Sequence, residues 1–270
     1  MVKLRYISDI HLEFLKTFPR IQNLDYQNES LCLLGDIGYA YSQIYNDFIG
    51  YCSQNWKNVF VIMGNHEFYC PNYGKYKDIF TMSEIEKCTE KFPKNVYFLN
   101  NKSILLDKNT NEIVTERSSL NVIKIIGSIL WSDINSFAGS KMNDYRMIYT
   151  KNGKLTPIET RQFFEINKQF ILDEINKDLD IKCVLLTHHG VHLEICNDYY
   201  SGGKLTSAYA TTIYELSLVK NLIACINGHS HVNINSFFPV TKIRLLANCM
   251  GYRGEDQKIV KYKKDAILEI

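Results

Sequence analysis

Five short segments carry side chains that can bind a metal ion, and each follows a run of apolar residues. They are Ser8-Asp9-Ile10-His11, Gly35-Asp36, Gly64-Asn65-His66-Glu67, His188-His189-Gly190 and Gly228-His229-Ser230-His231. Asp carboxylates, an Asn carbonyl oxygen and neutral imidazoles form a mixed oxygen and nitrogen ligand set. Such a set suits manganese, iron or zinc better than calcium. Because the segments contain no cysteine, a structural zinc site is not expected.

The candidate ligands are too many for one ion. They are Asp9, His11, Asp36, Asn65, His188, His229 and His231. A carboxylate can bridge two ions, so we expect two divalent transition metal ions, with manganese as the first choice and iron or zinc as alternatives. The usual task of such a centre is an in-line displacement at phosphorus by a metal-bound hydroxide.

The apolar runs before these segments read as buried strands. In open α/β sheets, ligands bind outside the carboxyl ends of the strands, so side chains far apart in sequence can meet in one crevice. The intervals from Asp9 to Asp36 and from Asp36 to Asn65 are close to the roughly 30 residues of one strand-helix-strand unit. Strands are predicted at 2–7, 31–34, 59–63, 96–99, 121–126, 182–187, 222–227, 232–238, 241–247 and within 258–269.

Helical periodicity lies between these strands and predicts an α/β fold. The C-terminal half is richer in strands, so its sheet should be mixed or antiparallel. The polar stretch 108–119 indicates a hairpin or an insertion loop. No repeat or linker divides the chain, so we expect a single domain over residues 1–270. Helices are predicted at 40–54, 75–91, 157–179 and 206–220.

The composition is that of an ordinary globular protein. The 270 residues are 46% hydrophobic and 22% charged, with a formal net charge of +2, which does not favour a partner held by its phosphate backbone. The eight cysteines are scattered, several within apolar runs, so they read as reduced. The N-terminus shows no signal-peptide pattern, and no run is long enough for a membrane span. We therefore expect a cytoplasmic protein without membrane contact.

The ordered series D-x-H, G-D, G-N-H-[D/E], H and G-H-x-H, from Asp9 to His231, resembles that of the calcineurin-like metallophosphoesterase superfamily and covers most of the chain. The resemblance implies a four-layer double β-sandwich flanked by helices. It implies that His66 contacts the phosphate and protonates the leaving alkoxide. It also implies a first metal ion on Asp9, His11 and His231, a second on Asn65, His188 and His229, and Asp36 as the bridge.

This chain departs from two groups within the superfamily, and these departures argue against the functions of those groups. The protein phosphatases of this superfamily carry G-D-x-V-D-R-G and R-G-N-H-E, whereas this chain has Tyr39 in place of the second Asp and Met63 before Gly64. The Asp that would orient His66 and a phosphate-binding Arg are thus missing, so a protein phosphatase is not expected and another group or water must orient His66. The repair nucleases of the superfamily add domains for which 270 residues leave little room.

The sequence does not decide the roles of several further residues near the predicted site. If the strand pleat continues, only one of His188 and His189 faces the metal ions, and we prefer His188. His189 would then either support a metal ligand or face the substrate. For His192, a contact at the rim of the site and a position on the plain protein surface are equal alternatives. Arg146 and Arg253 are candidate substrate contacts because guanidinium groups match phosphate oxygens. Segment 248–252 is also expected near the site. The aromatic residues Phe68, Tyr69 and Trp131 could either stack on the substrate or pack in the core.

The function predicted is hydrolysis of a small phosphodiester or phosphomonoester, with nucleotides and cyclic nucleotides among the candidates. One alternative is a non-catalytic scaffold with the same fold, which should have lost ligands or His66. Another is a nucleic-acid-processing phosphoesterase, which a basic patch around Lys141 and Arg146 would support.

Overall fold

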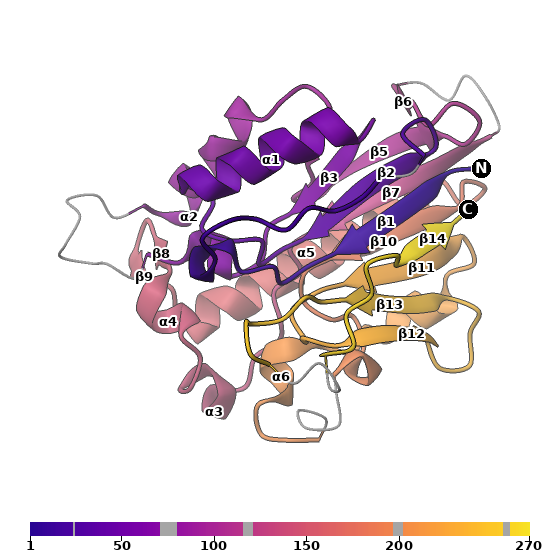
Figure 1. The fold of residues 1–270 in the computed structure, drawn as a ribbon. Coiled ribbons are helices and arrows are strands. Elements are labelled where there is room, and N and C mark those ends of the chain that lie inside the picture. Colours follow the sequence, from indigo (N-terminus) through magenta and orange to yellow (C-terminus); the bar gives the residue numbers. More distant parts are fainter. Residues whose placement is uncertain (24, 71–79, 116–120, 197–201, 256–259) are drawn as a thin grey trace.

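Two β-sheets form the centre of the protein, and helices flank them (Figure 1). The computed structural model describes residues 1–23, 25–70, 80–115, 121–196, 202–255 and 260–270. The first sheet has the order β14-β1-β2-β3-β4, and the second has the order β12-β13-β11-β10-β7-β5-β6. This is the layered α/β fold that the sequence predicted.

In the first sheet the neighbouring strands β1 to β4 run parallel, and β14 pairs with β1 in the antiparallel sense, which brings the two termini together (Figure 1). Every residue of β2 and β3 is buried, as expected for strands covered on both faces. The strands are β1 (Lys3–Ile7), β2 (Glu29–Leu34), β3 (Val59–Ile62), β4 (Val96–Phe98) and β14 (Ile267–Glu269).

The second sheet is mixed, as predicted. Strands β7, β10, β11 and β13 are parallel, whereas β12, β5 and β6 pair with their neighbours in the antiparallel sense. Its strands are β5 (Lys102–Asp107), β6 (Ile113–Val114), β7 (Val122–Ser128), β10 (Cys183–Thr187), β11 (Leu222–Asn227), β12 (Asn233–Phe237) and β13 (Arg244–Asn248). A separate pair consists of β8 (Tyr149–Thr150) and β9 (Gly153–Lys154).

Two long helices bury one face each. Helix α1 (Gln43–Asn55) begins at Ser42, whose side chain accepts from the Tyr45 backbone N–H. Helix α5 (Pro157–Lys177) begins with a capping box between Thr156 and Glu159, has proline in its first turn and packs on β7. Its buried residues recur at helical spacing: Thr160, Phe164, Asn167, Ile171 and Ile175. No helix in the described part of the chain combines the length and apolar character needed to cross a membrane.

The prediction of one helix over 206–220 is wrong. Only α6 and η5 are helical there, because the chain between them pairs with the loop after β10: Ala210 bridges Gly190, and Ile213 donates to the Val191 carbonyl. The shorter helices are α2 (Met82–Lys87), α3 (Ser136–Gly139), α4 (Asp144–Met147), α6 (Thr206–Tyr209), η1 (Leu12–Phe14), η2 (His66–Phe68), η3 (Cys88–Lys91), η4 (Leu193–Ile195) and η5 (Tyr214–Leu218).

The remaining predicted elements match within a few residues, and the sequence missed β5, β8 and β9. Strand β5 has only one fully buried residue, so it lacks the apolar run that marks its neighbours. Strands β5 and β6 form the hairpin that the polar stretch 108–119 indicated, although 116–120 lie outside the described residues. The predicted helix 75–91 is helical over 82–91, and 71–79 also lie outside them.

Candidate metal centre

The loops after β1, β2, β3, β10 and β11 meet at one edge, where the two sheets touch. Ser8 bridges Cys249 across this seam, and the Gly228 N–H donates to the His188 carbonyl. Five of the predicted ligands have left-handed backbone conformations, which cost on the order of 1–3 kcal/mol each and cluster at functional sites. They are Asp9, His11, Asp36, His229 and His231, with φ between 48° and 66°.

We call Asp9, His11 and His231 the outer cluster. His11 and His231 face each other with their Nε2 atoms 3.1 Å apart. Their Nδ1 atoms lie 3.1 Å from Glu13 and 2.7 Å from Glu255, and carboxylates can only accept, so both Nδ1 atoms carry hydrogen. Two neutral rings would then point lone pairs at each other, an arrangement that a cation between them stabilises.

A proton can take the place of the cation in the outer cluster. Burial opposes the charge of His231, but its hydrogen bonds to Asp9 and Glu255 outweigh burial and raise the pKa of His231 to about 9. The Asp9 carboxylate lies 3.4 Å from His231 Nε2 and also accepts from the His229 backbone N–H. A positive charge, from a cation or a proton, therefore stabilises the outer cluster.

We call Asp36, Asn65, His188 and His229 the inner cluster. His188 donates through Nδ1 to the Leu34 carbonyl at 2.8 Å, which leaves the Nε2 lone pair free. This atom lies 3.1 Å from Asn65 Oδ1, 3.1 Å from His229 Nδ1 and 3.4 Å from an Asp36 oxygen. Acceptor atoms converge here as well, and their number and type fit a divalent transition metal ion.

The Asn65 amide is oriented by two buried neighbours. Its nitrogen donates to Asp144 at 2.9 Å and lies 3.0 Å from the Tyr69 hydroxyl, which in turn donates to Asp144 at 2.6 Å. These contacts turn the Asn65 oxygen toward His188. The amide is thereby fixed as an oxygen ligand.

Burial sets the charge state of the inner cluster. It lowers the pKa of His188 to about 4, so this ring is neutral at pH 7 and can act as a ligand. Burial, together with the nearby Asp9 and Glu67 carboxylates, raises the pKa of Asp36 well above its usual range. A cation at this position would restore the Asp36 carboxylate, which is a further reason why the residues fit a metal ion.

Two glycines are needed because the ligands approach the backbone closely. A Cβ at Gly64 would lie 2.3 Å from an Asp36 oxygen and 2.5 Å from the His188 ring, and a Cβ at Gly35, whose φ is +83°, would lie 2.3 Å from His188 Nδ1. Glu67 holds these loops in place, because its buried carboxylate accepts from the backbone N–H groups of Gly64, Asp36 and Ile37.

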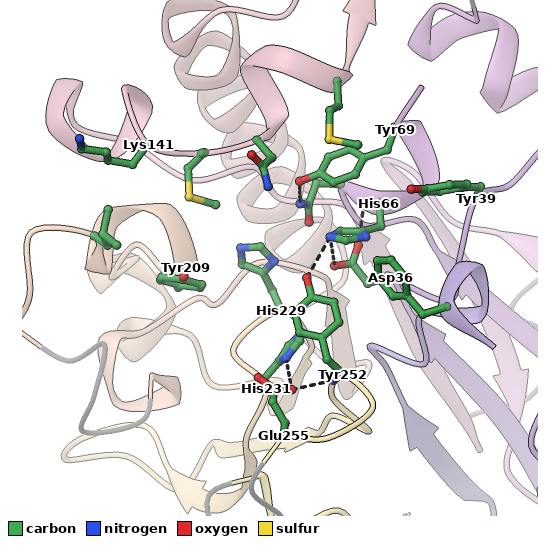
Figure 2. A pocket seen from close by; sticks show the side chains of 16 residues that line it. Asp36, Tyr39, His66, Tyr69, Lys141, Tyr209, His229, His231, Tyr252 and Glu255 are labelled. Atoms are coloured by element: carbon green, nitrogen blue, oxygen red, sulfur yellow. Dashed lines mark hydrogen bonds and ion pairs between the residues drawn. The ribbon is translucent and has the colours of Figure 1, made fainter. Parts of the chain in front are cut away.

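His66 lies beside both clusters, at the wall of a cavity of about 400 Å³ (Figure 2). Its Nε2 is 4.0 Å from an Asp36 oxygen and 3.2 Å from the Tyr252 hydroxyl. Its backbone N–H donates to Asp36 at 2.8 Å. The other lining residues are Phe14, Asp36, Tyr39, Asn65, Tyr69, Lys141, Met142, Asn143, Met147, Leu205, Tyr209, His229, His231, Tyr252 and Glu255.

The structure thus brings together all seven predicted ligands and His66, but it separates three other candidates from the cavity lining. His189 is buried, and its ring packs on those of His229 and Trp131, with centroids 4.3 and 5.3 Å away. Arg146 and Arg253 are exposed and do not line the cavity. Their predicted contact with substrate therefore has no support from this geometry.

The remaining open residues can also be placed. His192 caps η4 by accepting from the Glu194 N–H, away from the lining, and Phe68 and Trp131 are core residues. Tyr69 lines the cavity, and segment 248–252 lies at the site, where Tyr252 stacks on His11 at 4.2 Å.

Sequence reasoning missed three carboxylates that support the site. Glu13 and Glu255 accept from ligand histidines, and Asp144 orients Asn65. A signal existed for one of them, because Glu13 lies two residues after His11, on the same loop as two predicted ligands.

The family model for calcineurin-like phosphoesterases matches residues 3–233. The chain belongs to this family. This metallophosphoesterase is 28% identical to uncharacterized protein L509 of Acanthamoeba polyphaga mimivirus over 284 residues, which covers 96% of this chain and 94% of the viral protein. Its fold is similar to that of phosphopantetheinyl hydrolase from Mycobacterium tuberculosis, with a TM-score of 0.67 and 15% identity over 93% of this chain and 89% of that one. The protein is accordingly a metal-dependent phosphoric ester hydrolase.

Proposed function

We propose that this metallophosphoesterase hydrolyses a small phosphodiester at a centre of two divalent ions, with manganese the preferred metal and iron or zinc as alternatives. The observation that carries the proposal is the convergence of metal-ligand side chains in two adjacent clusters. The ligand atoms of Asp9, His11 and His231 lie within 4.8 Å of one another, and so do those of Asp36, His188 and His229. Asn65 Oδ1 lies 3.1 Å from His188 Nε2. The outer cluster would hold one ion and His188, His229 and Asn65 the other, with Asp36 shared between them.

When bound, the ions would neutralise phosphoryl oxygens and activate the attacking water. The protein supplies the rest of the chemistry. Asp9 and Asp36 would hold the ions with buried carboxylates. His66 faces the cavity through Nε2, from which it can donate a proton to the leaving oxygen as the bond to phosphorus breaks.

The charges around the cavity favour a diester over a monoester. Lys141 is the only Lys or Arg among the described residues that line the cavity, and its side chain lies on the side away from Asp36 and His66 (Figure 2). Two divalent ions would be balanced by the surrounding carboxylates, so a monoester dianion would find no lysine or arginine of the described cavity lining beside its extra negative charge. The four carboxylates are Asp9, Glu13, Asp36 and Glu255.

The size of the cavity favours a small substrate. A volume of about 400 Å³ lies in the range of small-molecule sites, roughly 300–1,000 Å³. Because the solved relative is named a phosphopantetheinyl hydrolase, a phosphopantetheinyl substrate belongs in a test panel with cyclic nucleotides, dinucleotides and short RNA. Turnover of RNA above that of all small diesters would favour the nucleic-acid alternative instead.

The experiment compares bis-p-nitrophenyl phosphate with p-nitrophenyl phosphate, with manganese, iron or zinc supplied separately. We expect metal-dependent turnover, a higher kcat/KM for the diester, about two metal equivalents per chain and loss of activity in Asp36→Ala. Asp133→Ala, on the exposed surface, is the control. A protein that binds no metal after reconstitution would contradict the proposal, and a preference for the monoester would overturn its diester part.

A further inference from the structure

The carboxylate of Glu13 joins His66 to the outer cluster. Glu13 lies on η1, and its side chain is only 2% exposed. Its Oε1 atom accepts from His66 Nδ1 at 2.7 Å and from His11 Nδ1 at 3.1 Å. One oxygen atom therefore contacts both a metal-ligand histidine and the histidine at the wall of the cavity.

This contact determines which nitrogen of His66 can exchange a proton with substrate. Because a carboxylate can only accept, Nδ1 keeps its hydrogen and Nε2 faces the cavity. The ring cannot tilt freely, since it lies between the rings of His11 and Tyr69, with centroids 4.4 and 4.3 Å away. The Tyr252 hydroxyl, 3.2 Å from Nε2, shows that an oxygen atom can reach this nitrogen.

The second Glu13 oxygen makes no contact within the described part of the chain that would explain a buried carboxylate, which leaves the two histidine contacts of Oε1. Oε2 is buried without a hydrogen-bond partner among the described residues, and leaving such an acceptor unpaired costs about 1–3 kcal/mol. A side chain needed only for packing would not require this carboxylate. The contact of Oε1 with His66 Nδ1 gives this carboxylate a role, because it leaves Nε2 as the nitrogen that faces the cavity.

We propose that Glu13 is the positioning residue for His66 and takes the place of the Asp that this chain replaces with Tyr39. It holds the ring so that the Nε2 proton passes to the leaving oxygen as the P–O bond breaks, and solvent then returns a proton to Nε2. The inference rests on the proposed phosphodiesterase function.

The test compares two esters whose hydrolysis depends to different extents on protonation of the leaving group. Bis-p-nitrophenyl phosphate releases a stable phenolate, whereas diphenyl phosphate releases a poorer leaving group that gains more from protonation. The variant is Glu13→Gln, and Glu255→Gln is the matched control, because both glutamates bond a histidine of the outer cluster but only Glu13 bonds His66.

With saturating manganese, we expect Glu13→Gln to lower kcat for diphenyl phosphate about 100-fold, the low end for loss of an acid catalyst, and kcat for bis-p-nitrophenyl phosphate only severalfold. Glu255→Gln should affect both esters equally. In a His66→Ala background, Glu13→Gln should cause little further loss on diphenyl phosphate. Glu13→Asp, which keeps the charge, should retain more of this activity than Glu13→Gln, and it provides the comparison if the Gln variant folds poorly.

Equal losses of Glu13→Gln on both esters, or full recovery with excess manganese, would overturn the inference, because Glu13 would then act through His11 alone. Failure of the proposed function gives a different result. In that case the wild type hydrolyses neither diester with any of the three metals, and the inference falls with it.

Discussion

The inner and outer clusters offer similar ligand atoms but are supported in different ways. The inner cluster is oriented by groups that solvent cannot reach: the Leu34 carbonyl holds His188, and Asp144 holds Asn65. The outer cluster is oriented by glutamates, and the Glu255 side chain is 31% exposed. The inner site should therefore be rigid and preformed, whereas the outer site should adjust to metal, proton and substrate.

The largest expected effect comes from crowding the inner cluster. In Gly64→Ala the new methyl group would overlap Asp36 and His188, and a displacement of ligands by about 1 Å can cost roughly 100-fold in rate. We expect a fall of at least that size in kcat/KM for bis-p-nitrophenyl phosphate. Gly50→Ala is the control, because its Cβ would meet no atom within 4 Å. Near-normal activity of Gly64→Ala would show that the inner cluster is not rigid.

Removal of Asp144 should weaken the inner cluster next most. Asp144→Ala removes one of the two groups that orient the Asn65 amide and the acceptor that holds the other, the Tyr69 hydroxyl, in a place where water cannot easily substitute. We expect metal affinity to fall toward the upper end of the 10–100-fold range for such supporting groups. Competition with a fluorescent chelator measures this affinity. Asp173→Ala, on the exposed side of α5, controls for loss of a carboxylate; an equal loss there would contradict the prediction.

Removal of Glu255 should weaken the outer cluster less. Solvent can reach this position and take over the hydrogen bond from His231, so Glu255→Ala should lower metal affinity only about 10-fold, near the lower limit for such groups. The same competition assay applies. If Glu255→Ala lost more affinity than Asp144→Ala, the distinction between a rigid inner and an adjustable outer cluster would be wrong.

The smallest change is one of protonation in the metal-free protein. The pKa of His188 is lowered to about 4 by burial, so its ring should stay neutral as the pH falls from 8 to 5. The pKa of His231 is raised to about 9, so its ring should be protonated at pH 7 and lose its proton only as the pH rises through 9. Ring nitrogen chemical shifts report both states. Titration of His231 below pH 7 would contradict the model of the outer cluster.

The structure brings the predicted ligands together, and the sequence could predict this convergence because each lies after a strand, in a motif of a few adjacent residues. His229 and His231, two positions apart after β11, are an example: one turn determines where both side chains point. His188 rather than His189 faces the clusters, as the alternation of side chains along β10 predicted. The strands themselves were visible as apolar runs, and their parallel order follows from the spacing of the motifs.

Two of the supporting carboxylates, Asp144 and Glu255, were not predictable in the same way, because their partners are distant in sequence. Asp144 is 79 residues from Asn65, and Glu255 is 24 residues from His231. The broken helix after Thr206 has a similar cause: pairing of Ala210 with Gly190 overrides the local helical pattern. Tertiary contacts decide both cases, and no short-range pattern reports them.

The position of both clusters at the seam between the sheets has a consequence for the lifetime of the protein. Each cluster takes ligands from both sheets: His11 and Asp36 follow strands of the first sheet, while His231 and His188 follow strands of the second. A bound ion would thus act as a cross-link between two halves of the molecule, and its binding energy would add to the free energy of unfolding. The concentration of available metal would then determine the fraction of the protein that stays folded as well as its rate of hydrolysis.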